Sequence, residues 1–282
     1  MTVWSFCPDQ IQNKLKDITI KNKGARPDLI EYRKLWVNWI QGFSGCENKK
    51  QWAVSNGIHD AITNQVAYKS RKVDTFYMFS NDYKFYNVIL GPYNYKFLTP
   101  KTIDSIKENS YIIVSQPNHE GKITEWFEPL KEKCRKTNSK IFLDCAFYGS
   151  TLNDTIDTSD DVFDAVAFSL SKNFLLGGWR VGIVFGDRLA PSLTVPIDHY
   201  YEYNYFNIAA VECGKIVLEN FKATYITEVA KPIQIQYCKE NNLTPADIWM
   251  WAIDLTGKKI CITNYIRDQI QEELNAISLS NR

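Results

Sequence analysis

The sequence predicts an α/β protein, with a mostly parallel sheet that has helices on both faces and a small, trimmed α+β domain. Short apolar runs rich in β-branched and aromatic residues alternate along the chain with stretches whose apolar residues have helical spacing. Strands that alternate with helices favour a parallel sheet wrapped by helices. The chain has 282 residues, 45% of them hydrophobic, which is enough to bury a large core and a smaller one.

The predicted elements follow in order. Residues 27–43 have apolar residues at helical spacing, and residues 55–68 are typical of a turn followed by a helix. A further helix is predicted at 123–136. Strand-like runs occupy residues 75–80, 110–116, 140–147, 164–171 and 180–187.

The last part of the chain predicts the smaller domain. Residues 206–242 form a long helical pattern that Pro232 should kink or end, because proline has no N–H to donate. Two strand-like runs, 246–255 and 258–266, and a polar helix follow. We therefore expect a large domain over residues 31–205 and a small domain made of 1–30 and 206–282.

Composition and charge argue against several classes of partner. The formal net charge is +1 and the 33 Lys and Arg are scattered, so we expect neither nucleic acid nor a membrane as partner. The chain shows no signal-peptide pattern and no apolar run of about 18 residues, which favours the cytoplasm. The seven cysteines never form C-x-x-C, which indicates reduced thiols and no metal site. We interpret His59, His119 and His199 as hydrogen-bonded loop or helix residues.

Lys172 is the first candidate functional residue, in "DAVAFSLSKNFLLGGWRVG". It follows the carboxyl end of one strand-like run, and ligands gather outside the carboxyl ends of strands in open α/β sheets. A lysine that is partly desolvated there, close to positive charge, can lose its proton and form a Schiff base with a carbonyl. Pyridoxal 5'-phosphate (PLP) is the cofactor that makes most use of such a lysine, and it requires an acidic partner for its ring nitrogen and donors for its phosphate.

The stretch "SLSKNFLLGGWRVG" resembles the lysine motif of the fold-type I PLP-dependent enzymes, in particular the class I/II aminotransferases of the aspartate aminotransferase superfamily. In that motif a serine stands three residues before the Schiff-base lysine, and an arginine followed by x-Gly comes after it. Ser169, Lys172, Arg180 and Gly182 reproduce this pattern. The resemblance implies that Lys172 is the catalytic residue and that Ser169 and Arg180 bind the cofactor.

Four upstream segments are similar to the family's other cofactor segments. "IFLDCAFYG" implies that Asp144 lies on the pyridine nitrogen, and "VSQPNHEG" places Asn118 beside the ring's 3-oxygen. "SNDYKFY" makes Tyr83 the candidate for stacking on the ring. "SNGIHDAI" resembles the turn that opens a helix beneath the phosphate, so Gly57 and Ile58 would supply backbone amides.

Two departures from the family pattern affect the predicted reaction. Phe147 stands where the family has a tyrosine, and Tyr148 is expected to face elsewhere. Lys258 and Lys259 stand where the family has an arginine that binds the substrate carboxylate. Lys259 is the candidate replacement, although a lysine lacks the planar fork of arginine, and Arg267 is a less favoured one.

The resemblance implies a PLP-dependent aminotransferase that acts on an amino acid and 2-oxo acid pair through a Lys172 Schiff base, as a homodimer with its active site at the subunit interface. Two alternatives stay open. One is a PLP-dependent lyase, decarboxylase or synthase acting on a modified amino acid, because alignment of the breaking bond with the ring decides the reaction. The other is a degenerate family member without turnover, suggested by the missing tyrosine and arginine.

Overall fold

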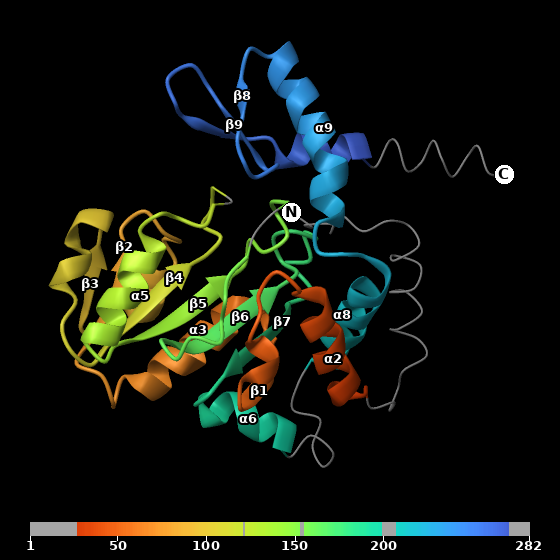
Figure 1. Cartoon of the computed structure of the whole chain (residues 1–282). Helices are drawn as coiled ribbons and strands as arrows, with labels where there is room; N and C mark the ends of the chain where they lie inside the picture. The colour runs from red at the N-terminus through yellow and green to blue at the C-terminus, as the bar shows by residue number, and fades with distance from the viewer. Residues whose placement is uncertain (1–26, 121, 153–154, 199–206, 271–282) are drawn as a thin grey trace.

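The computed structural model describes residues 27–120, 122–152, 155–198 and 207–270 (Figure 1). Its main sheet consists of β1 (Gln51–Asn56), β2 (Thr75–Phe79), β3 (Tyr95–Leu98), β4 (Ser110–Ser115), β5 (Lys140–Cys145), β6 (Phe163–Ser169) and β7 (Val181–Gly186). The strand order is β1-β7-β6-β5-β4-β2-β3. The strands from β6 to β3 run parallel, β7 is antiparallel to β6, and β1 is antiparallel to β7. The predicted mostly parallel sheet is therefore confirmed.

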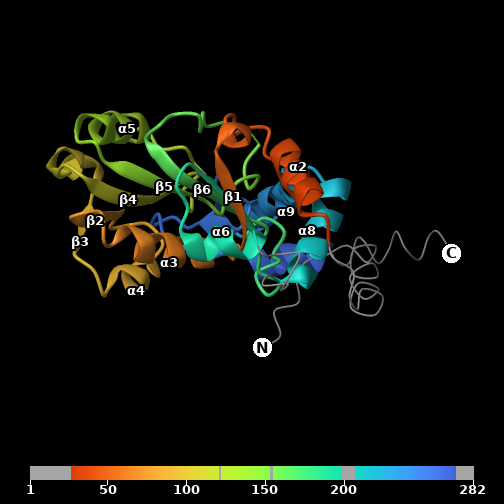
Figure 2. The ribbon, with the colours of Figure 1, turned by 90° about the horizontal axis from the view of Figure 1, so that it is seen from below.

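Helices cover both faces of this sheet, as predicted (Figure 2). One face carries α2 (Leu29–Trp39), α5 (Phe127–Lys136) and α8 (Ile208–Asn220), and the other carries α3 (Gly57–Lys69), α4 (Tyr86–Leu90) and α6 (Pro191–Asp198). Two short 3-10 helices, η1 (Cys46–Asn48) and η2 (Pro100–Ser105), lie in the connections. Each face of the sheet has its own cluster of buried apolar side chains, so the sheet lies between two cores.

The central strands are buried along their whole length. Every residue of β4 and of β6 is buried, and both sequences are nearly continuous apolar runs. This pattern is expected where helices cover both faces of a parallel sheet, because neither side of the strand meets water. Polar residues occur where the strands end, with Ser115, Asp144 and Ser169 at or next to the carboxyl ends of β4, β5 and β6.

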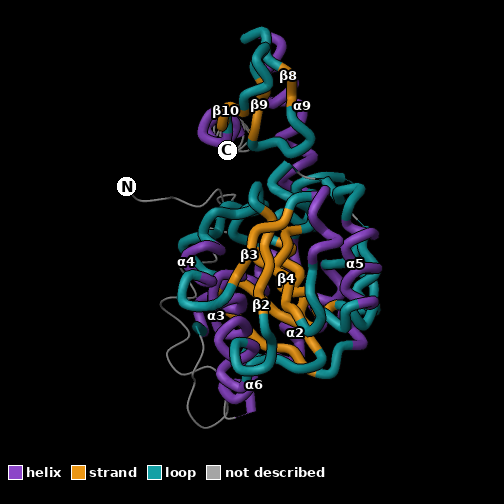
Figure 3. The backbone as a smooth tube through the Cα atoms, turned by 90° about the vertical axis from the view of Figure 1, so that its left-hand side faces the viewer, coloured by secondary structure: helices purple, strands orange, loops and turns teal. Residues whose placement is uncertain are grey.

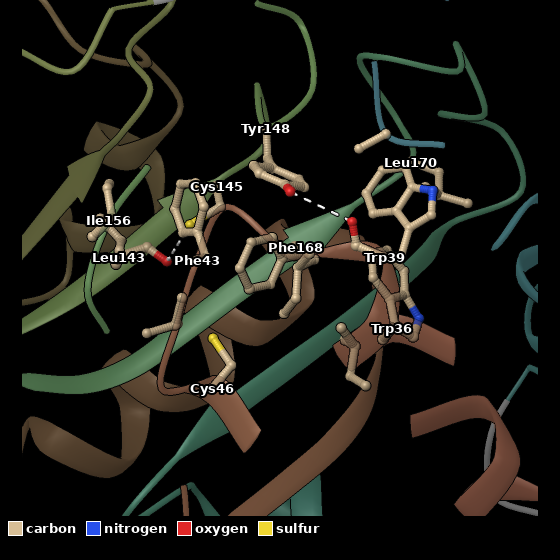
Figure 4. Packing of buried hydrophobic residues seen from close by; sticks show 14 of the residues in the cluster. Trp36, Trp39, Phe43, Cys46, Leu143, Cys145, Tyr148, Ile156, Phe168 and Leu170 are labelled. Carbon is tan, nitrogen blue, oxygen red and sulfur yellow. Dashed lines mark hydrogen bonds between the residues drawn. The ribbon is translucent and has the colours of Figure 1, made fainter. Parts of the chain in front are cut away.

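An aromatic cluster fixes the loop that follows β5 (Figure 4). The ring of Tyr148 packs edge-on against Phe43, with 4.8 Å between centroids, and against Trp39, with 5.6 Å. The Tyr148 hydroxyl donates a hydrogen bond to the Trp39 carbonyl at 3.4 Å, and Phe168 of β6 packs on the same tyrosine. These contacts hold the residues just after Asp144 against α2 and the sheet, so the loop has a defined position.

A smaller unit lies beyond the carboxyl ends of the strands (Figures 1 and 3). It contains α9 (Tyr225–Glu240) and an antiparallel sheet of β8 (Thr244–Pro245), β9 (Trp251–Ile253) and β10 (Lys259–Cys261) in the order β10-β9-β8. Residues 263–270 form a further helical segment. The small α+β domain of the prediction is therefore present.

The predicted boundary between the two domains, at residues 205 and 206, stays a prediction. Helix α8, which follows that boundary, packs against α2 and β7. Leu29, predicted to belong to the small domain, opens α2 and is buried in an apolar cluster that contains residues of both units. Residues 1–26 lie outside the described part of the chain, so the remainder of that N-terminal call is untested.

Pro232 was predicted to kink or end the helical pattern, and the prediction that it ends the pattern is wrong. The helical pattern is interrupted between α8 and α9, where Phe221 takes an extended backbone conformation, and Pro232 lies inside α9. Proline removes one helical hydrogen bond, but the flanking buried residues Ala230 and Gln234 hold α9 against the rest of the protein. Tertiary packing therefore outweighs the local penalty.

Candidate active site

The carboxyl ends of the parallel strands open into a cavity of about 580 Å³. Six of the nine residues predicted for the site line it, namely Ile58, Tyr83, Asp144, Ser169, Lys172 and Arg180. They come from α3, the turn after β2, the ends of β5 and β6, and the loop before β7. The fold thus brings together residues that are more than 100 positions apart in the sequence, at the edge where open α/β sheets bind ligands.

Lys172 lies half-buried in the loop between β6 and β7. Its Nζ atom is 5.8 Å from the centroid of the Tyr83 ring and 5.9 Å from that of the Phe147 ring. The amine therefore lies between two aromatic walls, with Asp144 near enough to feel its charge. A lysine in this position presents a nucleophilic nitrogen to the cavity rather than to bulk water.

Asp144 forms an acidic end of the cavity and is only 5% exposed. One carboxylate oxygen accepts a hydrogen bond from the Ala146 N–H at 2.8 Å, and the other accepts one from the Tyr86 hydroxyl. Burial raises the pKa of the Asp144 carboxyl, while the two hydrogen bonds and the charge of Lys172 act to lower it. A cationic ligand at this end of the cavity would favour the ionised carboxylate.

The opposite group of residues is suited to an anion. Helix α3 begins at Gly57, whose φ is 74°, and its first backbone N–H groups are not bonded within the helix. The Arg180 side chain lies directly against this turn, since a Cβ atom on Gly57 would be 3.0 Å from Arg180 Nη2. Arg180 Nε also donates to the Asn56 carbonyl at 3.0 Å. A helix N-terminus beside a guanidinium group is a favourable place for a phosphate.

The conformation of Arg180 is itself unusual. Its φ is 60°, in the left-handed region that non-glycine residues seldom adopt. Such backbone conformations concentrate at functional sites, where the surrounding structure holds them. Here the conformation directs the guanidinium back toward α3, while Gly182 gives that helix room: a Cβ atom on Gly182 would be 2.9 Å from the Gly57 Cα.

The positions of Phe147 and Tyr148 agree with the prediction from the sequence. Tyr148 faces the core, where it donates to the Trp39 carbonyl and its oxygen accepts from the Gly42 N–H at 3.1 Å. Phe147 lines the cavity in its place and offers no hydroxyl group. The cavity therefore lacks the donor that the family's tyrosine would provide at this point.

Asn118 and Lys259 are not among the residues that line the cavity. The Asn118 Oδ1 atom accepts hydrogen bonds from the Glu120 and Lys122 N–H groups, which leaves only its amide nitrogen to offer a ligand. Lys259 Nζ forms an ion pair with Glu120 at 2.6 Å and contacts His119 Nε2 at 3.2 Å. The lysine predicted to bind a substrate carboxylate is thus already paired with a carboxylate of the protein.

The other cations considered at the sequence level are also placed away from the cavity. Arg267 forms an ion pair with the neighbouring Asp268 at 2.8 Å, and the backbone N–H of Lys258 donates a hydrogen bond to the Asp254 carboxylate. Neither Lys258 nor Arg267 is among the lining residues. The only arginine in the cavity wall, among the residues that the structure describes, is Arg180.

Several lining residues were missed by sequence reasoning. Asp82, His59, His119, Tyr86 and Trp251 all face the cavity. Burial and the charge of Arg180 lower the pKa of His59, and burial and the charge of Lys259 lower that of His119. The sequence offers one signal for Asp82: it comes shortly after β2, and Asp144 likewise lies near the carboxyl end of β5. No local signal points to Trp251, which comes from the small unit. His199 lies outside the described residues.

The comparisons with known proteins agree with this geometry. The family model described as Aminotransferase class I and II matches residues 122–224, a segment that holds Asp144, Ser169, Lys172 and Arg180. A search of the curated proteins finds no match. The chain has the fold of the class I and II aminotransferases. The resemblance predicted from the lysine motif, and with it the fold class, is confirmed.

Three solved structures illustrate the likeness. Aspartate aminotransferase of Plasmodium falciparum is 18% identical, with a TM-score of 0.63 over 93% of this chain and 86% of that one. Tyrosine aminotransferase from Leishmania infantum is 14% identical, with a TM-score of 0.63 over 87% and 77%. The PLP-bound C-S lyase from Staphylococcus hominis is 13% identical, with a TM-score of 0.67 over 87% and 73%. At these identities the likeness establishes the fold and leaves the reaction open.

Among the described residues, no group of three or more His, Cys, Asp or Glu could hold a metal ion. Cys46, Cys134, Cys238 and Cys261 form no disulfide, and of these Cys261 is exposed, while Cys7 lies outside the described residues. None of the described helices has the length and apolar character needed to cross a membrane.

Proposed function

We propose that the chain is a PLP-dependent aminotransferase that acts on an amino acid and 2-oxo acid pair, with Lys172 as the covalent attachment point of the cofactor. One observation carries this proposal. A single cavity presents the Lys172 amine between an acidic residue, Asp144, and an anion-binding group made of Arg180 and the start of α3. An aldehyde that carries a basic ring nitrogen and a phosphate requires these three features.

The residues present fit PLP. The Gly57 and Ile58 N–H groups, with Ser169 and Arg180, would hold the phosphate. The Arg180 guanidinium lies so close to the start of α3 that a Cβ atom on Gly57 would be 3.0 Å from its Nη2 atom, so both kinds of donor could reach one anion. Asp144 would hold the ring nitrogen, Tyr83 would stack on the ring, and the Asn118 amide would lie on the side of the 3-oxygen. When bound, PLP supplies an electron sink for the pair of electrons left when a bond at the substrate Cα breaks.

The chain's own residues then have distinct tasks. Lys172 Nζ would hold the aldehyde carbon of the cofactor and, when free, would act as the general base that takes the proton from the substrate Cα. Asp144 would keep the ring nitrogen protonated, and the Tyr86 hydroxyl and Ala146 N–H orient its carboxylate. Trp251 from the small unit covers part of the cavity and would limit the access of water.

A lyase acting on a modified amino acid is the second candidate. Two observations favour it: Phe147 offers no hydroxyl to the cavity, and Lys259 is paired with Glu120 instead of being available to a substrate carboxylate. A C-S lyase is also among the proteins of similar fold. A degenerate member without turnover is less well supported, because Lys172, Asp144, Ser169 and Arg180 line one cavity together.

The first experiment tests the attachment point. The purified protein is incubated with PLP, reduced with borohydride and digested, and the labelled peptide is mapped. We expect the label on Lys172. A label on any other lysine contradicts the proposal, and Lys259→Ala, which removes the lysine that contacts the cavity-lining His119, serves as a control that should still be labelled.

The second experiment separates the candidate reactions. The protein loaded with PLP is mixed with a panel of amino acids, and pyridoxamine phosphate, 2-oxo acid and ammonia are measured. Formation of pyridoxamine phosphate and a 2-oxo acid in equal amounts supports transamination. Release of ammonia with the 2-oxo acid supports a lyase, and no product from any amino acid supports the degenerate member.

We further propose that the chain works as a homodimer in the cytoplasm. A group of exposed apolar side chains, Tyr83, Phe85 and Val88, lies at and beside the turn that borders the cavity, and Tyr83 and Phe85 stack at 6.2 Å. A second copy of the chain would cover such a group. Light scattering should give twice the chain mass of 32.7 kDa, and Val88→Asp should shift the equilibrium toward the monomer. A monomeric wild-type protein contradicts this proposal.

A further inference from the structure

The turn that follows β2 places a second carboxyl group in the wall of the cavity. Asp82 lines the cavity together with Asp144; Asp82 follows β2 and Asp144 lies near the end of β5, and these two strands flank β4 in the sheet. Ser115, the last residue of β4, is paired in register with Asp144 on one side. On the other side its N–H donates to the Asp82 carboxylate at 2.9 Å. The two acids therefore lie on either side of one residue.

Asp82 is bound only by uncharged groups. Besides the Ser115 N–H, it accepts the N–H of Tyr83 at 2.8 Å, and no cation forms an ion pair with it among the described residues. The Ser115 bond joins the turn that carries Tyr83 to the carboxyl end of β4, and the Tyr83 bond holds the backbone within that turn. This turn holds the aromatic ring that lies 5.8 Å from Lys172 Nζ, so the bonds of Asp82 position that ring.

The charge of Asp82 depends on pH within the neutral range. Burial raises the pKa of its carboxyl to about 7, and the charge of Asp144 adds to this effect, although the two N–H donors oppose it. The other ionisable groups that face this corner are Tyr86, Lys172 and Cys145. Burial and the neighbouring acids raise the pKa of Tyr86, so its hydroxyl keeps its proton at neutral pH.

We propose that Asp82 is a positioning residue of the cofactor site, which holds the Tyr83 turn against β4 and adds its negative charge to the end of the cavity where Asp144 lies. This inference rests on the proposed function. Below neutral pH, Asp82 is a neutral acid and Asp144 alone faces the ring nitrogen. Above neutral pH, two carboxylates favour a proton on that nitrogen, because each negative charge stabilises the protonated form.

The first test uses the absorbance of the cofactor bound to Lys172. The wild type and Asp82→Asn are loaded with PLP, and their visible spectra are recorded between pH 5 and 9. The absorbance midpoint of Asp82→Asn should shift to lower pH by roughly half a unit, since a nearby negative charge favours the protonated form of the bound cofactor. Asp82→Glu, which restores a carboxylate, should return the midpoint toward the wild-type value.

A matched control is available on the same strand. Asp74 lies exposed at the amino end of β2, far along the strand from the cavity, so Asp74→Asn makes the same change of charge without touching the site. Its midpoint should equal that of the wild type. An Asp82→Asn midpoint equal to that of Asp74→Asn overturns the inference while leaving the proposed function intact. Failure of the wild type to take up PLP at Lys172 overturns the proposed function, and the inference with it.

The second test does not use the cofactor or activity. Because the folded state holds the Asp82 proton up to about pH 7 and the unfolded state loses it near the ordinary aspartate value, Asp82 makes the protein less stable as pH rises over that interval. The ratio of folded to unfolded Asp82→Asn relative to wild type should rise by up to about tenfold per pH unit between roughly pH 5 and 6.5. The lost hydrogen bond contributes an offset independent of pH, so only the slope decides. Equal slopes in urea unfolding of the full chain contradict the charge part of the inference.

Discussion

Two buried aspartates, near opposite ends of the neighbouring strands β5 and β6, differ in the groups that bind their carboxylates. Asp164, near the start of β6, receives the Lys69 ammonium, the Gln65 amide at 2.7 Å and the Tyr111 hydroxyl at 2.9 Å. Asp144, at the end of β5, receives only the Tyr86 hydroxyl and the Ala146 N–H. Lys172 acts on Asp144 through its charge, without an ion pair among the described residues.

The difference distinguishes an acid whose charge the protein itself neutralises from an acid that faces the cavity. The charge of Asp164 is neutralised by the buried Lys69, and Asp164 is not among the residues that line the cavity. Asp144 has similar burial and a similar tyrosine partner, but its open side faces the cavity. A ligand in the cavity could therefore supply the positive charge that pairs with Asp144. Variants at the two positions should separate activity from stability.

The largest expected effect concerns Lys172→Ala. Among the described residues, the one other lysine that lines the cavity is the exposed Lys84 of the turn after β2, so the covalent link to PLP should be lost and turnover should fall by at least about 10³-fold. The urea midpoint of the protein without cofactor should stay near that of wild type. Steady-state kinetics with the best amino acid found, and urea unfolding, measure the two effects. Retained turnover would remove Lys172 from the mechanism.

The second prediction is for the acid whose charge the protein itself neutralises. Lys69→Met leaves the Asp164 carboxylate buried without its cation and should lower the free energy of unfolding by about 3–5 kcal/mol. The kcat per folded molecule should be unchanged, because neither residue touches the cavity. Urea unfolding measures the loss, with the exposed Lys101→Met as control. A loss of kcat at temperatures where the variant is folded would contradict the separation of the two acids.

The third prediction returns to the cavity. Asp144→Ala should keep PLP bound, since the phosphate contacts at α3 and Arg180 remain, and should lower kcat by about 10²-fold because the ring nitrogen loses its counter-charge. The visible spectrum reports binding, and initial rates report kcat. Unchanged kcat would show that the acidic end of the cavity does not serve the cofactor.

The smallest expected effect is at Lys259, which contacts the cavity-lining His119. If the substrate carboxylate displaces Glu120 from Lys259, Lys259→Ala should raise KM a few-fold and leave kcat nearly unchanged, because the contact is the same in the ground and transition states. Lys258→Ala is the matched control, since Lys258 is the exposed neighbouring lysine. A wild-type KM in both variants means that the carboxylate is bound elsewhere and favours the second candidate reaction.

Sequence reasoning succeeded best where a residue's position follows from local pattern. The strand-like runs at 140–147 and 164–171 predict strands, and their polar ends therefore predict that Asp144 and Lys172 lie at one edge of a sheet. It did less well where long-range pairing decides the structure. Strand β1 has only three consecutive apolar residues, and it is a strand because it pairs with β7 across more than 100 residues.

The amino-acid sequence by itself determined the alternation of strands and helices, the order of Asp144, Ser169, Lys172 and Arg180 along the chain, and the absence of a tyrosine at Phe147. These depend on local propensity and on residue identity, which a linear sequence contains. Only the tertiary structure decided that Lys259 is paired with Glu120, that α8 packs against α2 and β7 and that Asp82 joins Asp144 in the cavity wall. The physical reason is that ion pairing, burial and the resulting pKa depend on which distant segments meet, and packing of the whole chain determines those meetings.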